Sequence, residues 1–339
     1  MSAKVAVIGT GAWGTTFAQV CAHAGNQVVL WGRNPEVVDA INAHCNERYL
    51  PGLKLDPKIS ATTDMLAAID GAQMVVVAIP SQTAREALAP ICGKLGADTV
   101  VLSLMKGIEL GTDLRMSEVL VEALGVQAGQ VAVLSGPNLA KEIAQQQPTA
   151  TVVAAQDEEV ANKVAQLCAA PYFRPYTNTD VVGVELGGSV KNVIALAAGM
   201  ALGLGYGLNT AATIITRGLV EITRLGLALG ADRETFAGLA GMGDLVATCA
   251  SPLSRNQRFG RAIAEGLSRE EAQLKTGGTA EGVKSCQSIA HLARANNVDM
   301  PITFGVEEIL HGNRDPREIT QVLLSRPRKA EGISATPQE

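Results

Sequence analysis

The sequence predicts an α/β domain with a mostly parallel sheet, followed by an all-α C-terminal domain. Short apolar runs alternate with helical stretches in the first half of the chain, and such runs disappear after about Val182. The length of 339 residues also exceeds what one hydrophobic core usually serves. We therefore expect two domains, residues 1–182 and 183–339.

Several strand-like segments rich in Val, Ile and Leu predict the first domain. Continuous apolar strands that alternate with helices indicate a parallel sheet covered on both faces. Helices are expected at 13–25 and from about 35 to 44. The predicted strands are residues 4–9, 27–32, 73–80, 99–104, 130–136, 149–156 and 172–177.

Helical periodicity from Asp180 to about Leu324 predicts the second domain. Its longest apolar helix, around residues 190–208, is rich in Gly and Ala and is interrupted by Lys191, which indicates a core helix rather than a membrane span. The tail from about residue 326 is polar and is expected to be flexible.

Composition excludes several classes of function. A net charge of −5 and an aromatic content of 3% argue against a nucleic-acid partner. The cysteines form no C-x-x-C pair and the histidines lack metal-ligand spacing, so we expect free thiols and no metal. No signal peptide precedes the first strand, which predicts a cytoplasmic protein without membrane insertion. A homodimer is the default assembly.

A glycine-rich turn follows the first predicted strand. Gly9-Thr10-Gly11-Ala12-Trp13-Gly14 matches G-x-G-x-x-G and opens a helix, the context of a Rossmann-type dinucleotide site. Gly9 allows the tight turn, Gly11 lets a pyrophosphate approach the backbone, and Gly14 lets helix and strand pack closely. The helix N-terminus would supply N–H donors to the phosphates. A glycine turn without a ligand is the alternative.

The second predicted strand is followed by Gly32-Arg33-Asn34. NAD sites usually place Asp or Glu there, whereas a guanidinium suits a 2′-phosphate or stacks on adenine. NADP(H) is therefore favoured and NAD(H) is possible, and the alternative is a solvated surface arginine.

Two further segments follow predicted strands, at the edge where open α/β folds bind ligands: Met105-Lys106-Gly107 and Ser135-Gly136-Pro137-Asn138. Lys106 would place a cation at that edge. Its alternative is a loop lysine in water.

Lys191 lies within the apolar segment GVELGGSVKNVIALAAGMALG. On a helix it shares a face with Gly187, Gly188, Ala195, Ala198 and Gly199, a strip nearly free of side chains that would let another backbone or a ligand come close. We expect a solitary ammonium, because residues 186–205 offer no carboxylate and Glu185 and Asp180, on the preceding turns, are expected to point elsewhere. Burial would lower its pKa and suit proton exchange with a reacting oxygen. Alternatively, its head reaches water.

A second basic cluster lies at Ser254-Arg255-Asn256, where a helix is expected to begin. A hydroxyl, a guanidinium and backbone N–H groups suit a phosphate, although an ordinary capped helix would look the same. Asp244, in a glycine turn, could accept a substrate hydroxyl, orient Lys191 or cap the turn. Glu281 could hold a ribose or amide group, or favour a helix start.

These segments resemble the NAD(P)-dependent glycerol-3-phosphate dehydrogenase family, bacterial type, over about residues 4–325. The resemblance is carried by GTGAWGTT, SGPNLAKE, GGSVKNVIA, TRGLVEITRLG and GMGDLVATCASPLSRNQRFG. It implies cytoplasmic, reversible reduction of dihydroxyacetone phosphate, a small phosphorylated substrate, to sn-glycerol 3-phosphate for phospholipid synthesis.

The resemblance also implies roles for individual residues, with Lys191 as the catalytic proton donor and acceptor. The implied substrate-binding residues are Lys106, Gly136, Asn138, Asn192, Asp244, Thr248, Ser254, Arg255 and Asn256. The implied cofactor-binding residues are Gly9, Gly11, Ala12, Trp13, Gly14, Arg33, Lys106, Ala140, Arg255 and Glu281. Ala12 departs from the family's common serine, and Asn138 from its small hydroxyl residue.

Two other functions stay open on the residues alone. One is a related helical-domain dehydrogenase of a hydroxy acid or sugar acid. The other is a non-catalytic dinucleotide-sensing protein, against which Lys191 argues because sensing needs no proton donor.

Overall fold

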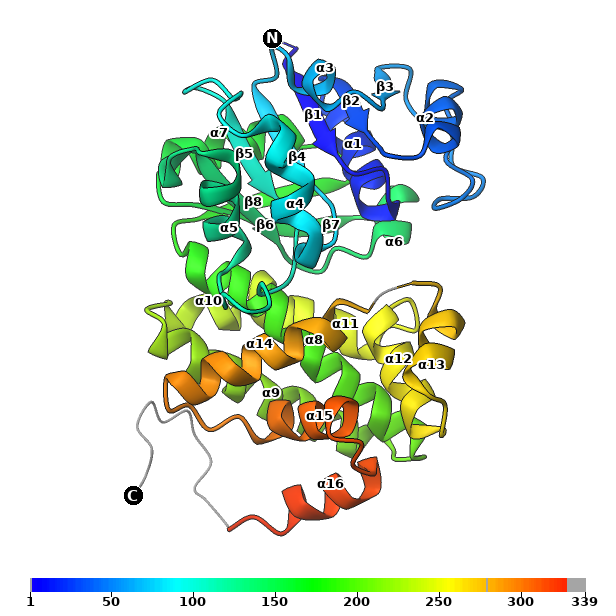
Figure 1. Cartoon of the computed structure of the whole chain (residues 1–339), viewed down its shortest axis with the longest axis vertical. Coiled ribbons are helices and arrows are strands. Elements are labelled where there is room, and N and C mark those ends of the chain that lie inside the picture. Colours follow the sequence, from blue (N-terminus) through cyan, green and yellow to red (C-terminus); the bar gives the residue numbers. More distant parts are fainter. Residues whose placement is uncertain (1, 279, 328–339) are drawn as a thin grey trace. The chain divides into compact units, whose positions relative to one another are not determined.

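The predicted fold class is confirmed by a computed structural model, which describes residues 2–278 and 280–327 (Figure 1). The chain forms two compact units. The first contains the residues up to Met105 together with Met116–Val181, and the second contains Lys106–Arg115 and the residues from Val182 onwards. Beyond residue 327, the tail predicted to be flexible lies outside the described residues.

The first unit contains an eight-stranded sheet in the order β3-β2-β1-β4-β5-β6-β7-β8. All neighbouring strands are parallel except β6 and β7. The strands are β1 Lys4–Ile8, β2 Gln27–Trp31, β3 Ile59–Thr62, β4 Met74–Val77, β5 Val100–Ser103, β6 Val131–Ser135, β7 Thr149–Ala155 and β8 Phe173–Asn178. Of these strands, β3 alone was not predicted; it is an edge strand in which Ile59 is the one buried residue.

Helices cover the sheet in two groups. α1, α6 and α7 pack together, as do α4 and α5, and right-handed crossovers place these groups on opposite faces. The helices are α1 Ala12–His23, α2 Pro35–Asn42, α3 Met65–Ile69, α4 Ala84–Leu88, α5 Met116–Leu124, α6 Ala140–Ala144 and α7 Glu158–Cys168. Short 3₁₀ turns occur at Ser81–Thr83, Ala89–Ile91 and Ala128–Gln130.

The strand order positions the glycine turn. The chain winds from β1 to β2 in one direction and from β4 onwards in the other, so the carboxyl ends of β1 and β4 form a topological switch point. Phe17 of α1 makes an edge contact with Phe173 of β8, with ring centroids 6.2 Å apart, which joins the helix to the sheet, and a second edge contact with Trp13 of the same helix at 5.7 Å. Burial of such a side chain contributes about 1.5–3 kcal/mol.

From Val182 onwards, the described residues of the second unit form helices joined by turns and loops, drawn from green to red in Figure 1, whereas its other segment, Lys106–Arg115, contains no helix. Its central helix is α8 Val181–Gly203, which by length and composition alone could cross a membrane; 94% of its most apolar window is buried inside the protein, as in a core helix. The other helices are α9 Leu208–Ala228, α10 Arg233–Ala237, α11 Asp244–Ala250, α12 Arg255–Ala264, α13 Arg269–Thr276, α14 Glu281–Ala295, α15 Pro301–His311 and α16 Pro316–Leu324.

Glycines let other backbone segments approach α8 closely. A Cβ on Gly187 would lie 2.4 Å from the carbonyl oxygen of Ala240, in the π-helical turn Leu239–Gly243. A Cβ on Gly199 would lie 1.9 Å from the carbonyl oxygen of Gln257 in α12. At these two positions the strip predicted to be free of side chains therefore meets other backbone segments.

Candidate active site

The turn after β1 has the geometry that its glycines predict. Gly9 has a φ of +127°, and a Cβ there would lie 2.4 Å from the carbonyl oxygen of Ala78, just beyond β4. A Cβ on Gly14 would lie 2.2 Å from the carbonyl oxygen of Gly9. Neither position can take a side chain without backbone movement, so the sheet and α1 meet at backbone distance.

Gly11 differs from the other two glycines. It precedes α1 with a φ of −68° and provides no side-chain cap, and a Cβ there would meet no atom of the described residues within 4 Å. The first turn of α1 therefore presents backbone N–H groups beside open space. This is the arrangement in which a helix N-terminus binds phosphate oxygens.

Asn46, which was not among the predicted site residues, stabilises this turn. Its side chain is buried, and its Nδ2 donates hydrogen bonds to the carbonyl oxygen of Thr10 at 3.0 Å and to Thr15 Oγ1 at 2.9 Å. Thr15 Oγ1 in turn donates to the carbonyl oxygen of Thr10 at 3.1 Å. Asn46 lies 36 positions from Thr10, so no local pattern could have revealed the contact.

Other features of the first unit fit a dinucleotide. Trp13 Nε1, at the start of α1, is buried without a hydrogen-bond partner in the described part of the chain. Arg33 follows β2 and is exposed, while Asn34 caps α2 by accepting a hydrogen bond from the Glu36 N–H at 2.9 Å. A free helix N-terminus, an unpaired indole N–H and an exposed guanidinium beyond adjacent strands together suit a phosphate-bearing dinucleotide.

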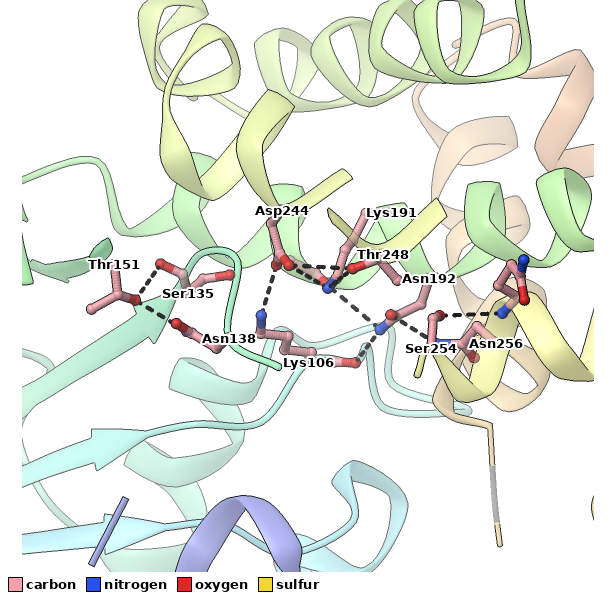
Figure 2. Close-up of polar contacts among 12 residues, drawn as sticks. Lys106, Ser135, Asn138, Thr151, Lys191, Asn192, Asp244, Thr248, Ser254 and Asn256 are labelled. Atoms are coloured by element: carbon pink, nitrogen blue, oxygen red, sulfur yellow. Dashed lines mark hydrogen bonds and ion pairs between the residues drawn. The ribbon is translucent and has the colours of Figure 1, made fainter. Parts of the chain in front are cut away.

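The turn after β6 contains the predicted residues Gly136 and Asn138. Asn138 Nδ2 donates to Thr151 Oγ1 at 3.0 Å, and Thr151 Oγ1 donates to the Ser135 carbonyl oxygen at 3.0 Å (Figure 2). Asn138 Oδ1 and Ser135 Oγ are buried without a hydrogen-bond partner within residues 2–278 and 280–327. The amide nitrogen of Asn138 thus binds β7, and its buried amide oxygen has unused hydrogen-bonding capacity among the described residues.

Ala140 begins α6, and its carbonyl oxygen accepts a hydrogen bond from Thr16 Oγ1 of α1 at 3.3 Å. This contact fixes the start of α6 beside α1. Ala12, the first residue of α1, offers only a methyl group at the position where serine is common in the family that the sequence resembles.

Lys191 has a carboxylate partner, so the expectation of a solitary ammonium is wrong. Its Nζ donates to Asp244 Oδ1 at 2.5 Å and to Thr248 Oγ1 at 2.6 Å, and Lys191 is only 5% exposed (Figure 2). Both partners lie on α11, which follows the π-helical turn packed against Gly187. The tertiary contact made possible by that glycine brings the carboxylate of Asp244 to Lys191.

Asp244 joins two lysines. Its Oδ2 accepts a hydrogen bond from Lys106 Nζ at 2.7 Å, while its Oδ1 accepts from Lys191 (Figure 2). Lys106 begins the segment Lys106–Arg115, which belongs to the second unit although it follows β5. Two ammonium groups that share one buried carboxylate leave one excess positive charge, which suits an anionic or polarised ligand.

Burial lowers the pKa of Lys191 to about 8. The carboxylate of Asp244 opposes this shift, and the positive charge of Lys106 adds to it. An amine that titrates near neutral pH can exchange a proton with a reacting oxygen.

Two asparagines extend this cluster towards α12. Asn192 Nδ2 donates to the carbonyl oxygen of Lys106 at 3.3 Å, and Asn256 Nδ2 donates to Asn192 Oδ1 at 2.9 Å. Asn256 Oδ1 accepts from the Gly282 N–H at 3.1 Å. These bonds hold the start of α12 beside the lysines.

The start of α12 has the predicted phosphate-binding groups. Ser254 caps the helix by accepting a hydrogen bond from the Gln257 N–H at 3.3 Å, and Arg255 is exposed at the first helical position. Glu281 is the first residue of α14. The helix start thus offers an exposed guanidinium beside a buried, hydrogen-bonded asparagine.

Hydrogen bonds connect six of the predicted residues in the second unit: Lys106, Lys191, Asn192, Asp244, Thr248 and Asn256. The predicted residues of the first unit lie on three turns, after β1, β2 and β6. Within the described residues, no three His, Cys, Asp or Glu side chains gather as a metal site would require.

Comparison with known proteins identifies the family. Sequence models described as the N-terminus and C-terminus of NAD-dependent glycerol-3-phosphate dehydrogenase match residues 4–161 and 180–321. Proteins named glycerol-3-phosphate dehydrogenase [NAD(P)+] from Thermobifida fusca and Streptomyces griseus are 56% and 55% identical to this chain, and each alignment covers 97% of this chain and 98% of the relative.

A crystal structure of glycerol-3-phosphate dehydrogenase from Coxiella burnetii is similar in fold, with a TM-score of 0.90 and 38% identity over 96% of this chain and 99% of that one. The chain therefore belongs to the NAD-dependent glycerol-3-phosphate dehydrogenase family.

Proposed function

We propose that this protein is an NAD(P)-dependent glycerol-3-phosphate dehydrogenase that reversibly reduces dihydroxyacetone phosphate to sn-glycerol 3-phosphate and supplies phospholipid synthesis. The observation that carries the proposal is the buried cluster in which Lys191 and Lys106 share the carboxylate of Asp244. Ketone reduction needs a proton donor beside the carbonyl oxygen, and this cluster provides one in a family that performs this reaction.

Lys191 is the proposed proton donor. Asp244 and Thr248 hold its Nζ from two sides, so the amine is oriented before substrate arrives. With a pKa of about 8, most of the amine is protonated near neutral pH, and it can still release that proton to the forming alkoxide. In the reverse direction, the neutral amine accepts the proton of the alcohol.

Lys106 and Asp244 are proposed to hold the middle of the substrate, with Asn192 and Thr248 supporting them. The substrate phosphate would bind at the start of α12, on Arg255 together with Ser254 and Asn256. Gly136 and Asn138 complete the proposed set, in which Asn138 Oδ1, buried without a hydrogen-bond partner in the described residues, would bind the substrate.

The first unit is proposed to hold the dinucleotide, and residues 1–182 and 183–339 to serve as cofactor-binding and substrate-binding domains. A bound reduced nicotinamide supplies the hydride. The residues proposed to hold the cofactor are Gly9, Gly11, Ala12, Trp13, Gly14, Arg33, Lys106, Ala140, Arg255 and Glu281. Arg33 favours NADP(H) over NAD(H), because its guanidinium suits a 2′-phosphate and no carboxylate follows β2 directly.

We further propose a cytoplasmic enzyme without membrane insertion that assembles as a homodimer. Burial of α8 supports the absence of a membrane span. Two-fold homodimers are the commonest assembly of soluble oligomers.

The test compares dihydroxyacetone phosphate with unphosphorylated dihydroxyacetone, following reduced nicotinamide by its near-ultraviolet absorbance. We expect a strong preference for the phosphorylated ketone, and we expect Arg255→Met to raise its KM. The matched control is Arg261→Met, because Arg261 lies exposed on the same helix and pairs with Glu265 at 2.8 Å. Equal rates on the two ketones would contradict the proposal, and so would equal KM values for the two variants.

A further inference from the structure

The segment that carries Lys106, residues 106–115, is anchored to the second unit at several points; we name it the strap. At its start, Lys106 pairs with Asp244. In its middle, Ile108 is fully buried in the helical core, and the carbonyl oxygen of Glu109 accepts a hydrogen bond from Ser288 Oγ of α14 at 3.3 Å. Asp113, near its end, contacts His291 of the same helix.

The strap is also closed on itself. Ile108 and Arg115 form an antiparallel bridge, and the Glu109 N–H donates to the carbonyl oxygen of Leu114 at 3.0 Å. Arg115 thus lies beside Ile108, only two residues from Lys106, although it is the last residue of the strap. Any displacement of Arg115 is transmitted to the backbone that carries the lysine.

Arg115 forms an ion pair with Glu185 of α8. Its Nη1 lies 2.8 Å from Glu185 Oε2, and the two side chains are 18% and 5% exposed. Glu185 lies on the helix that also carries Lys191, six positions earlier. Ion pairs therefore hold both ends of the strap: Arg115 pairs with Glu185 of α8, and Lys106 pairs with Asp244 of α11.

We propose that Arg115 and Glu185 are a positioning pair that fixes Lys106 relative to Lys191 and Asp244. The proposal rests on the proposed function, because it assigns these residues a part in the same reaction. Neither is proposed to touch the substrate. Each acts through the strap, which sets where the Lys106 ammonium lies.

The pKa of Lys191 separates the two possibilities. It should change if Arg115 positions Lys106, and it should stay the same if Arg115 only stabilises the fold. Asp244 and Cys249 of α11 raise its pKa, and the ammonium of Lys106 on the strap lowers it. If the strap loosens, Lys106 moves away from both Lys191 and Asp244. Each change raises the pKa of Lys191. The positive charge of Lys106 lies farther away, and the carboxylate of Asp244 interacts with Lys191 alone.

The experiment measures the pH dependence of kcat/KM for dihydroxyacetone phosphate in Arg115→Met and Glu185→Gln, with NADPH affinity and thermal unfolding alongside. We expect kcat/KM to fall about tenfold, mainly through KM, and the kinetic pKa of Lys191 to rise by about half a unit to one unit. The charge-swapped Arg115→Glu/Glu185→Arg double variant should recover part of both changes. The matched control, Arg314→Met, removes an arginine from exposed pairs with Glu308 and Glu318 and should change neither.

An unchanged pH profile and a kcat/KM within twofold of the unsubstituted enzyme, in folded Arg115→Met, would overturn the inference. If that variant is too unstable to assay, Arg115→Lys, which keeps the charge but loses the fork geometry, is judged by the same criteria.

The pH dependence of Lys191 labelling by an amine reagent, followed by mass spectrometry, reports the same pKa without turnover. An enzyme that does not reduce dihydroxyacetone phosphate would refute the proposed function. The labelling experiment would still decide whether Arg115 positions Lys106: a raised pKa supports the inference, and an unchanged pKa rejects it.

Discussion

The glycine turn of the first unit and the lysine cluster of the second unit are built in opposite ways. The turn lies within Gly9–Gly14, and its shape follows from the absence of side chains that would meet backbone atoms at 2.2 and 2.4 Å. The cluster depends on ion pairs between residues 53 and 138 positions apart. A site made of local backbone can be derived from a short pattern, whereas a site made of distant side chains depends on the packed fold.

The largest expected effect is on the cluster. Lys191→Ala should lower kcat by about 10²–10⁴-fold, because the proposed proton donor is lost. The affinity for NADPH, measured by titration calorimetry, should stay nearly unchanged, because the turn that we expect to bind it is intact. Thr248→Val keeps the amine and removes one partner, so its kcat should fall less. Turnover of Lys191→Ala close to that of the unsubstituted enzyme would remove Lys191 from the chemistry.

Asp244→Asn tests whether the shared carboxylate is what makes the cluster work. The substitution keeps the shape but leaves two ammonium groups without the negative charge between them. We expect kcat/KM for ketone reduction to fall by roughly 10²-fold, a loss of the order seen when a preorganised electrostatic partner is removed.

The sign of the pH shift follows from the charges. Reduction needs protonated Lys191, so its rate declines as pH rises through about 8. Because Asp244 raises the pKa of Lys191, its loss should move this decline to lower pH by about one unit. Glu265→Gln, which removes a carboxylate paired with Arg261 and Lys275 at the surface, is the matched control. A decline that stays in place or moves to higher pH would contradict the assignment.

The same contrast explains which sequence predictions succeeded. Apolar runs predicted the buried strands, and the glycine pattern predicted the turn, because both are local properties. The edge strand β3 was missed because Ser60 and its neighbours lack a continuous apolar signal. Lys191 was identified but expected to be solitary, because the glycines around it indicate that a backbone segment comes close without indicating which one, and here it is the π-helical turn before Asp244.

Within the glycine turn, two substitutions should separate folding from binding. Gly14→Ala places a Cβ against the carbonyl oxygen of Gly9, so overpacking of about 1–3 kcal/mol should lower Tm by several degrees. Gly11→Ala meets no protein atom within 4 Å and should leave Tm unchanged. It should nevertheless weaken NADPH binding about tenfold, because the methyl group occupies the space proposed for the pyrophosphate. Unchanged NADPH affinity in Gly11→Ala would show that the pyrophosphate does not bind there.

Asn46→Ala has the smallest expected effect. It tests whether the glycine turn, although local in sequence, also depends on a distant side chain. The variant loses two hydrogen bonds, to the Thr10 carbonyl oxygen and to Thr15 Oγ1. If the one bond made directly to the turn, to the Thr10 carbonyl oxygen, contributes about 1 kcal/mol to the binding conformation, NADPH should bind roughly five times more weakly.

Asn42→Ala is the matched control for the NADPH affinity of Asn46→Ala. Asn42 lies four positions earlier and also makes two hydrogen bonds, both with the backbone of Ala61 on β3. Both variants should lower Tm, since each loses two hydrogen bonds, but only Asn46→Ala should weaken NADPH binding. If both weaken it equally, the effect is a general loosening of the sheet edge, and the turn at Gly9–Gly14 is held by its own backbone alone. If they differ, even the most local site in this protein depends on a residue that its sequence pattern does not include.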